Sequence, residues 1–316
     1  MELRIFTEPQ QGASYEDLLA VALEAERVGF GAFFRSDHYL HMGEPPPGSA
    51  EPLPGPTDAW VTLAGLARDT RRIRLGTLVS PVTFRHPGPL AITVAQVDAM
   101  SGGRVELGLG AGWYPEEHLA YGIPYPAQLG ERFDRLEEQL AIVTGLWRTP
   151  VGGQFEFSGR HYRIQGSPAL PKPRQRPGPP VIVGGSGTRR MPRLAARYAD
   201  ECDVAFQRFE RTEEVFRALD AACEKEGRDP ATLARSVALT VVCAEEPVTL
   251  RRRAVAAGRD LAELRRDGLA GRPEEVAEAL SDYAAIGVSR VYLQILDLAD
   301  LDHVRLLGEQ LLPLVG

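Results

Sequence analysis

The sequence predicts an α/β fold, specifically a (β/α)₈ TIM barrel formed by a single domain over residues 1–316. Strand-like and helix-like segments alternate from end to end and give eight consecutive strand–helix units. Such a barrel usually needs about 250 residues, so the chain has room for one insertion. The strands are mostly apolar runs, such as VIVGG and VYLQIL, as expected where both faces of a parallel sheet are covered.

Periodicity and capping residues predict where each element begins and ends. Ser14 with Asp17 three residues later is typical of a helix start, and Gly29 is typical of a helix end. The expected strands are 3–8, 32–38, 73–80, 105–110, 181–185, 203–206, 236–244 and 290–296. The expected helices are 14–28, 58–69, 89–100, 131–147, 189–198, 213–226, 250–265, 273–286 and 301–314.

Two segments depart from the alternation. Residues 151–179, after the fourth unit, contain two short strand-like pieces at 154–157 and 161–164, followed by a proline-rich linker. We interpret them as an inserted hairpin. Residues 43–57 contain six prolines and are expected to form a loop, because proline fits neither a helix interior nor a paired strand.

An open doubly wound sheet is the competing architecture. That fold binds its dinucleotide through G-x-G-x-x-G after the first strand. The first strand here runs into TEPQQG, which lacks the pattern. The sequence therefore favours the barrel.

Composition excludes several functional classes. The balance of 36 basic and 43 acidic residues gives a net charge of −7, which argues against a nucleic-acid or anionic-membrane partner. No apolar run approaches the roughly 20 residues that cross a bilayer, and the first residues carry no signal-peptide pattern. Three cysteines without a C-x-x-C pair fit a reducing cytoplasm.

In a (β/α)₈ barrel the reacting groups lie at the carboxyl ends of the strands. His38 ends the second expected strand, and a neutral imidazole suits proton transfer near neutral pH because it can both donate and accept. This position favours a catalytic role over a structural one. The neighbouring Asp37 either contacts a ligand or orients the local backbone, and the residues alone leave both roles open.

Two glycine-rich segments also follow expected strands. The turn 184–187 opens onto a helix, where free N–H groups suit a phosphate, although glycine can equally serve the dihedral angles of a tight turn. Alternate glycines over 108–112 allow a planar ring to approach the backbone, or merely allow close packing. No metal-site, P-loop or serine-nucleophile motif is present, so no metal is expected. These features together indicate that a cofactor carries the chemistry.

Several segments in a specific order resemble the bacterial luciferase-like monooxygenase superfamily, and within it the coenzyme F420-dependent oxidoreductases. They are FFRSDH (33–38), RIRLGTLVSPVTFRHP (72–87), SGGRVELGLGAGW (101–113), RFDRLEEQL (132–140), PPVIVGGSG (179–187) and the ending GRPEEVAEAL with GVSRVYLQ. The resemblance spans nearly the whole chain.

The resemblance implies an isoalloxazine-like ring across the barrel mouth, with His38 as the catalytic residue near its reactive centre. It also implies a bulge with a non-proline cis peptide at Leu78–Val79. The turn after the fifth strand would take the phosphate, and the arginines at 189, 190 and 193 would favour an acidic F420 tail. The expected cofactor-binding residues are Asp37, Leu78, Val79, Ser80, Ala111, Gly112, Trp113, Gly185, Ser186, Gly187 and Thr188.

One position departs from the resemblance. Some sugar-phosphate dehydrogenases of the superfamily carry an acidic residue where this chain has Trp113, so glucose 6-phosphate is not expected as the substrate. Glu116 or Glu117 could serve as an acid, or could simply begin a helix after Pro115.

Three functions follow from these observations. The first is an F420-dependent oxidoreductase that transfers a hydride between coenzyme F420 and a small organic substrate, with His38 handling the proton. The alternative is an FMN-dependent luciferase-like monooxygenase, which uses O₂ and reduced flavin from a separate reductase. The third is a flavin-binding relative without activity. Loop 43–57 and the insertion are expected to cover the substrate, and family analogy predicts a homodimer.

Overall fold

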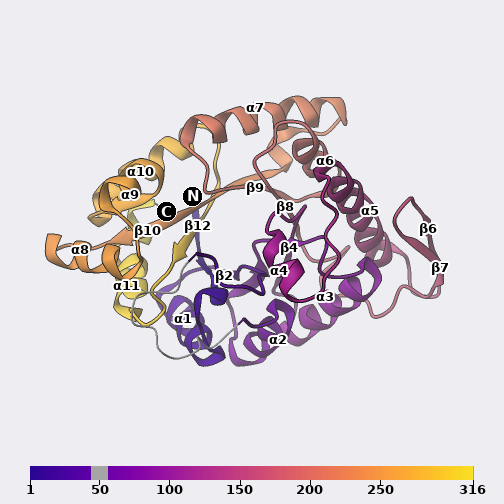
Figure 1. Cartoon of the computed structure of the whole chain (residues 1–316), viewed down its shortest axis with the longest axis horizontal. Helices are drawn as coiled ribbons and strands as arrows, with labels where there is room; N and C mark the ends of the chain where they lie inside the picture. Colours follow the sequence, from indigo (N-terminus) through magenta and orange to yellow (C-terminus); the bar gives the residue numbers. More distant parts are fainter. Residues whose placement is uncertain (44–55, 316) are drawn as a thin grey trace.

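The computed structural model describes residues 1–43 and 56–315. Within these residues, eight parallel strands form a closed barrel in the order β10-β12-β1-β2-β3-β5-β8-β9 and back to β10, which confirms the predicted fold class (Figure 1). In chain order the strands are β1 (Glu2–Thr7), β2 (Ala32–Arg35), β3 (Arg74–Thr77), β5 (Val105–Gly110), β8 (Val181–Gly184), β9 (Glu201–Ala205), β10 (Ala234–Cys243) and β12 (Arg290–Ile295).

Helices surround this barrel. They are α1 (Tyr15–Val28), α2 (Ala59–Asp69), α3 (Pro87–Ser101), α4 (Pro115–Ala120), α5 (Leu129–Arg148), α6 (Arg190–Tyr198), α7 (Phe209–Lys225), α8 (Pro247–Ala256), α9 (Leu261–Asp267), α10 (Pro273–Ala285), α11 (Leu301–Leu306) and α12 (Leu312–Val315). The predicted start of α1 is confirmed, because Ser14 and Asp17 form a reciprocal capping box. Asp58 caps α2 through the amides of Trp60 and Val61.

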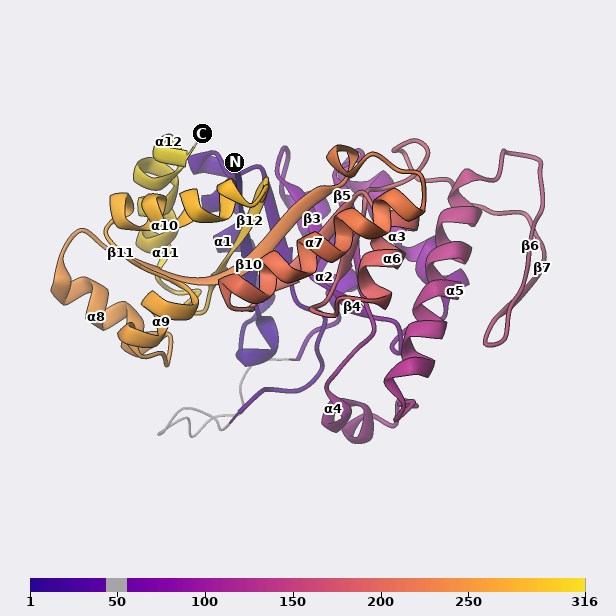
Figure 2. The ribbon, with the colours of Figure 1, turned by 90° about the horizontal axis from the view of Figure 1, so that it is seen from above.

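The predicted insertion is also present. The strands β6 (Phe155–Ser158) and β7 (Arg163–Ser167) pair antiparallel as a hairpin after α5. Figures 1 and 2 show this hairpin standing away from the barrel, beyond α5. Most of the predicted loop 43–57 lies outside the described residues.

Two expected helices are interrupted. The helix expected over 250–265 is wrong, because α8 ends before Gly258, whose φ of 62° leaves the helical region, and Asp260 caps the separate helix α9. The short strand β11 (Leu269–Gly271) then pairs with β10 and was not expected. The last helix contains a π-helical turn over Leu307–Leu311, between α11 and α12.

The barrel interior is layered along its axis. Charged side chains fill the amino ends of the strands, where buried Arg4 donates to Glu106 at 2.7 Å and to the Tyr292 hydroxyl at 3.0 Å. An apolar layer follows, formed by Phe6, Ala32, Phe34, Leu78, Ile182, Ala238 and Tyr292. The carboxyl ends of the strands lie beyond this layer and form the mouth. In Figure 2, α4 lies at this end, opposite the two chain termini.

Candidate functional site

A bulge interrupts the third barrel strand at the mouth. Gly76 of β3 pairs with Glu106, and Ser80 of β4 (Ser80–Pro81) pairs with Leu109, so one strand has one residue more than its partner between the two pairs. The peptide bond between Leu78 and Val79 within this bulge is cis, as the resemblance implies. Leu78 is buried in the apolar layer, and the partly exposed Val79 packs against it.

The glycines of β5 make room for the bulge. A Cβ atom on Gly108 would overlap the Thr77 carbonyl oxygen, and a Cβ atom on Gly110 would lie 2.7 Å from Val79 Cγ2. Gly184 of β8 faces the same side chain, since its Cβ would lie 2.9 Å from Val79 Cγ1. Of the two alternatives for the glycines on β5, the structure therefore supports close packing: Val79 occupies the space beside them.

His38, which is partly exposed, pairs with the buried Glu117. Its Nδ1 lies 3.1 Å from both carboxylate oxygens of Glu117, which is 1% exposed and also accepts from the Tyr39 amide at 3.0 Å. Because a carboxylate only accepts, Nδ1 carries the hydrogen, and Nε2 remains as the nitrogen that can exchange a proton with a ligand. Glu117 lies in α4, so this short helix both follows Pro115, as expected, and supplies the acidic partner of His38.

Asp37 is fully buried beneath the mouth. Arg85 forms an ion pair with it, and the Ser80 hydroxyl donates to its Oδ2 at 2.5 Å. Arg85 also pairs with Asp58, the cap of α2. These contacts support the second of the two roles considered for Asp37, which is to fix the local backbone. Direct contact of Asp37 or Ser80 with a cofactor stays a prediction.

The turn between β8 and α6 has unpaired amides. Within the part of the chain that the structure describes, the Gly185 amide donates to Asp203, whereas the amides of Ser186, Gly187 and Thr188 have no protein acceptor. A Cβ atom on Gly187 would meet nothing within 4 Å, so the turn is open on that side. Three free N–H groups at an open helix start fit a phosphate or another anion.

Two arginines of α6 are paired with acidic residues of α5. Arg190 donates to Asp134 and Arg193 donates to Glu137, both on α5, in ion pairs of 2.5 and 2.6 Å. The arginine that reaches the turn is Arg211 of α7, whose Nη2 donates to the Ser186 carbonyl oxygen at 2.8 Å. Arg190 and Arg193 are therefore engaged by α5, and the expectation that they and Arg189 favour an acidic tail stays a prediction.

Aromatic rings line the mouth beside His38. Gly112 adopts a φ of 76°, which turns the chain after β5 and suits glycine. Trp113, which is 63% exposed, stacks on Tyr114, and both rings meet the imidazole of His38 edge-on at centroid distances of 5.8 and 6.3 Å. Ala111 and Gly112 are partly exposed, so together with Trp113 they can border a flat ligand.

Sequence reasoning missed two groups here. Glu8 directly follows β1 at the barrel mouth, and a position directly after a barrel strand was also the signal that singled out His38. His118 on α4 donates from Nδ1 to the Tyr114 carbonyl oxygen at 2.7 Å, and its Nε2 accepts from the Thr83 hydroxyl at 2.6 Å. His118 therefore holds the loop that carries Trp113, which only the folded arrangement reveals.

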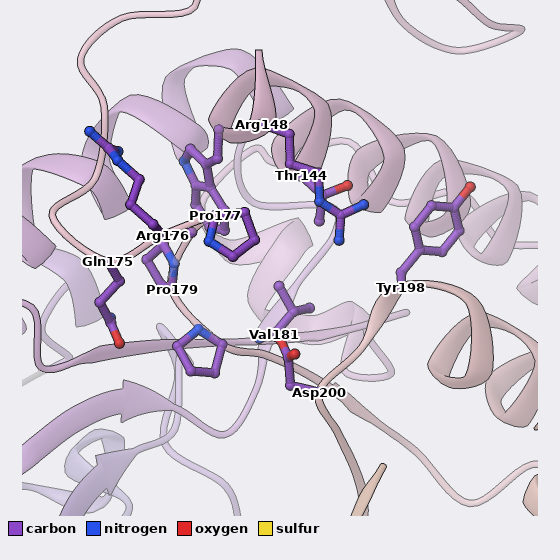
Figure 3. Close-up of a pocket in the computed structure, with 12 residues that line it drawn as sticks. Thr144, Arg148, Gln175, Arg176, Pro177, Pro179, Val181, Tyr198 and Asp200 are labelled. Carbon is purple, nitrogen blue, oxygen red and sulfur yellow. Dashed lines mark hydrogen bonds between the residues drawn. The ribbon is translucent and has the colours of Figure 1, made fainter. Parts of the chain in front are cut away.

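A separate cavity lies at the other end of the barrel. It has a volume of about 370 Å³ and lies at the start of β8, between α5, α6 and the proline-rich linker (Figure 3). Its polar lining includes Arg148, Arg176 and Asp200. The candidate residues follow the end of β8 rather than its start, so this cavity does not belong to the mouth.

Two further findings concern other kinds of site. In residues 1–43 and 56–315, no group of three or more His, Cys, Asp or Glu side chains could hold a metal ion. None of the described helices combines the length and apolar character that crossing a membrane requires.

Comparison with curated proteins identifies named relatives. The F420-dependent glucose-6-phosphate dehydrogenase of Microbacterium testaceum (strain StLB037) is 33% identical over 219 residues, which cover 67% of this chain and 60% of that protein. The F420-dependent hydroxymycolic acid dehydrogenase of Mycobacterium tuberculosis (strain ATCC 25618 / H37Rv) is 31% identical over 243 residues, covering 74% and 61%. The chain thus spans about 60% of the length of these relatives.

Solved structures share the fold along the whole chain. The monooxygenase RslO1 from Streptomyces bottropensis superposes with a TM-score of 0.82 at 25% identity and full coverage of both chains. An F420-dependent secondary alcohol dehydrogenase in complex with an F420–acetone adduct gives a TM-score of 0.82 at 18% identity, covering 100% and 99%, and shows the fold alone. A family model described as luciferase-like monooxygenase matches residues 1–263. The chain therefore belongs to the luciferase-like monooxygenase family.

Proposed function

We propose that the chain is an F420-dependent oxidoreductase, which transfers a hydride between coenzyme F420 and a small organic substrate. The names of the relatives at 31% and 33% identity support the choice of cofactor. The geometric observation that carries the proposal is the pairing of His38 with Glu117 at the same barrel end as the three free amides of Ser186, Gly187 and Thr188. One group suits proton transfer and the other suits the anionic part of a cofactor.

Each group of residues at the mouth would have a separate role in this reaction. The amides of the β8–α6 turn bind the cofactor's phosphate, while Val79 and the segment from Ala111 to Trp113 border its ring. Reduced F420 supplies a hydride when bound. His38 gives the accompanying proton to the substrate, or takes it in the reverse reaction. Glu117 accepts from Nδ1 and thereby keeps the imidazole oriented and stabilises its protonated form.

An FMN-dependent monooxygenase is the second candidate. It is supported by the similarity to the monooxygenase RslO1, which covers both chains completely at 25% identity. Its ring would occupy the same mouth, and its phosphate would meet the same turn. The two candidates differ in the cofactor's tail and in the use of O₂.

Titration of the protein with both cofactors separates the candidates. We expect tight binding of F420, followed by fluorescence, and at least tenfold weaker binding of FMN. A preference for FMN together with O₂ consumption would contradict the proposal.

A glycine variant tests whether the turn holds the phosphate. Gly187→Ala adds a methyl group on the open side of the turn, so folding is expected to be unaffected while F420 binding weakens by about tenfold, or about 1.4 kcal/mol. Gly130→Ala on α5 is the matched control, because its Cβ would also meet nothing within 4 Å, and it is expected to bind F420 normally. Equal affinity of Gly187→Ala and Gly130→Ala would place the phosphate elsewhere.

A further inference from the structure

One guanidinium group holds both sequence neighbours of His38. Arg85 donates from Nη1 to Asp37 Oδ2 at 2.5 Å and from Nη2 to Asp37 Oδ1 at 3.2 Å, which is the two-pronged geometry of a strong ion pair. The same Nη2 atom donates to the Tyr39 hydroxyl at 3.0 Å. Because His38 lies between Asp37 and Tyr39 in the sequence, a single side chain anchors the residues on either side of it.

Arg85 is itself held in place from two directions. Gln139 of α5, which is fully buried, donates from Nε2 to the Arg85 carbonyl oxygen at 2.8 Å. Asp58, the cap of α2, lies 2.5 Å from Arg85 Nη2 and also accepts from the Tyr39 hydroxyl at 2.7 Å. Arg85 therefore joins the segment that carries His38 to both α5 and α2.

The contacts continue through the bulge at the mouth. The Ser80 hydroxyl donates to Asp37 at 2.5 Å and accepts from the Trp60 indole N–H at 3.3 Å. Trp60 lies in the first turn of α2 beside Asp58, so the contacts form a closed ring that returns to Arg85. Asp37, Ser80 and Trp60 are at most 2% exposed, and hydrogen bonds shielded from water in this way are stronger. The ring of contacts is therefore a firm support beneath His38.

The contact between His38 and Glu117 depends on this support. The Glu117 carboxylate accepts from the Tyr39 amide at 3.0 Å and lies 3.1 Å from His38 Nδ1. Tyr39 is fixed by the hydrogen bond from Arg85 and by its ring, which stacks on Phe84 at a centroid distance of 4.6 Å. A displacement of Tyr39 would therefore weaken the contact that keeps the imidazole oriented.

We propose that Arg85 is a positioning residue, which keeps the His38 imidazole in the orientation that directs Nδ1 to Glu117 and leaves Nε2 for a ligand. The inference rests on the proposed function, in which His38 exchanges a proton with the substrate, and deepens it. Lysine is not an adequate substitute for Arg85, because a single ammonium group does not reproduce the planar fork that holds Asp37 and Tyr39 together.

The orientation of His38 can be measured in the protein without cofactor. In mildly alkaline solution, where the imidazole is neutral, long-range ¹H–¹⁵N spectra are expected to show wild-type His38 as the Nδ1–H tautomer, identified by its absence in His38→Ala. In Arg85→Lys the Nδ1 and Nε2 shifts are expected to move toward each other, because the ring then exchanges between tautomers. Identical His38 nitrogen shifts in Arg85→Lys and the wild type would overturn the inference.

Two further variants complete this measurement. Arg104→Lys is the matched control, because Arg104 also anchors several groups, among them the Ala67 carbonyl oxygen at 2.8 Å, but does so at the amino end of β5. It is expected to leave the His38 shifts unchanged. Tyr39→Phe removes one anchor and keeps the ion pairs of Arg85, so it is expected to fold and to shift the His38 nitrogens in the same direction by a smaller amount. If Arg85→Lys does not fold, unchanged shifts in Tyr39→Phe would overturn the inference.

A double-mutant cycle shows whether Arg85 acts through His38. The probe reaction is the oxidation of reduced F420 by benzaldehyde. Arg85→Lys is expected to lower kcat about tenfold, while the Kd for F420 stays within about twofold of the wild type. In the His38→Ala background the same substitution is expected to change kcat less than about twofold, because the group that Arg85 positions is already absent. An equal loss of kcat in both backgrounds would overturn the inference, since it would show that Arg85 acts on the fold or on another group.

The outcomes separate the two proposals. If F420 binds and the His38 shifts are the same with and without Arg85, the assignment of Arg85 fails and the proposed function stands. Absence of F420 binding would count against the proposed function alone, and absence of benzaldehyde turnover would concern the substrate alone. In both cases the nitrogen shifts of His38 would still decide the role of Arg85.

Discussion

The imidazole of His38 and the carboxylate of Glu117 lie 3.1 Å apart, although 79 positions separate the two residues in the sequence. This contact uses Nδ1 and leaves the Nε2 nitrogen for a ligand. The position of His38 at the mouth could be predicted, because the carboxyl ends of barrel strands form the mouth of a (β/α)₈ fold. Glu117 could not be assigned from the sequence, since a glutamate after Pro115 is equally typical of a helix start. Only the folded chain, in which α4 contacts the segment after β2, brings the two together.

Substitutions of His38 and Glu117 are expected to lower kcat without changing the affinity for F420. His38→Ala is expected to lower kcat at least about 100-fold, which is the usual contribution of a general acid or base. Glu117→Gln removes the charge but keeps the shape, and the loss of a charged hydrogen bond of about 1.5–3 kcal/mol corresponds to a fall in kcat of about 10-fold to 160-fold. Both variants should bind F420 with wild-type affinity in a fluorescence titration. Wild-type kcat in His38→Ala would remove His38 from the mechanism.

At the scale of elements, most helices and strands could be predicted, and the errors have local causes. The break between α8 and α9 arises where Gly258 leaves the helical region and Asp260 caps a new helix, although the apolar pattern continues through it. The third strand was expected over 73–80, and the bulge that the resemblance implies at Leu78–Val79 divides it into β3 and β4. The ion pairs of Arg190 and Arg193 with acidic residues of α5 could not be predicted, because the sequence does not reveal which helices face each other.

The pairing of α5 with α6 makes a further prediction. Arg193→Gln breaks the ion pair with Glu137, which is partly exposed and is therefore expected to stabilise the fold by less than about 1 kcal/mol. F420 affinity should remain within about twofold of the wild type, measured by titration. Arg211→Gln is the informative comparison, because Arg211 holds the Ser186 carbonyl oxygen and its loss should weaken F420 binding. A large loss of affinity in Arg193→Gln would show that α6 supplies charge to the cofactor after all.

At the scale of the whole molecule, a buried histidine links α11 to the end of β10. His303 is 4% exposed, and its Nε2 accepts from the Cys243 amide at the end of β10 at 3.0 Å. Burial, assisted by Arg253, lowers the pKa of His303 to about 3. Nothing in the sequence at the start of a helix distinguishes this histidine from an exposed one.

The free energy of unfolding should therefore fall at acid pH because of His303. The unfolded chain binds a proton at His303 below its ordinary pKa of 6.5, whereas the folded chain does so only near 3, so stability is fully present above 6.5 and falls as pH decreases. The contribution is up to about 1.4 kcal/mol per pH unit in this window. His303→Gln keeps an acceptor for Cys243 and should show a shallower decrease in the free energy of unfolding, measured with urea. Identical pH dependence in His303→Gln and the wild type would contradict this account, and His86→Gln, at an exposed position, serves as the control.

A crystal structure of the protein with oxidised F420 tests the central claim most directly. The account predicts the deazaflavin ring at the mouth, bordered by Val79 and Trp113, with the phosphate on the amides of Ser186, Gly187 and Thr188. Density for F420 outside the mouth, or a phosphate bound away from the β8–α6 turn, would contradict it.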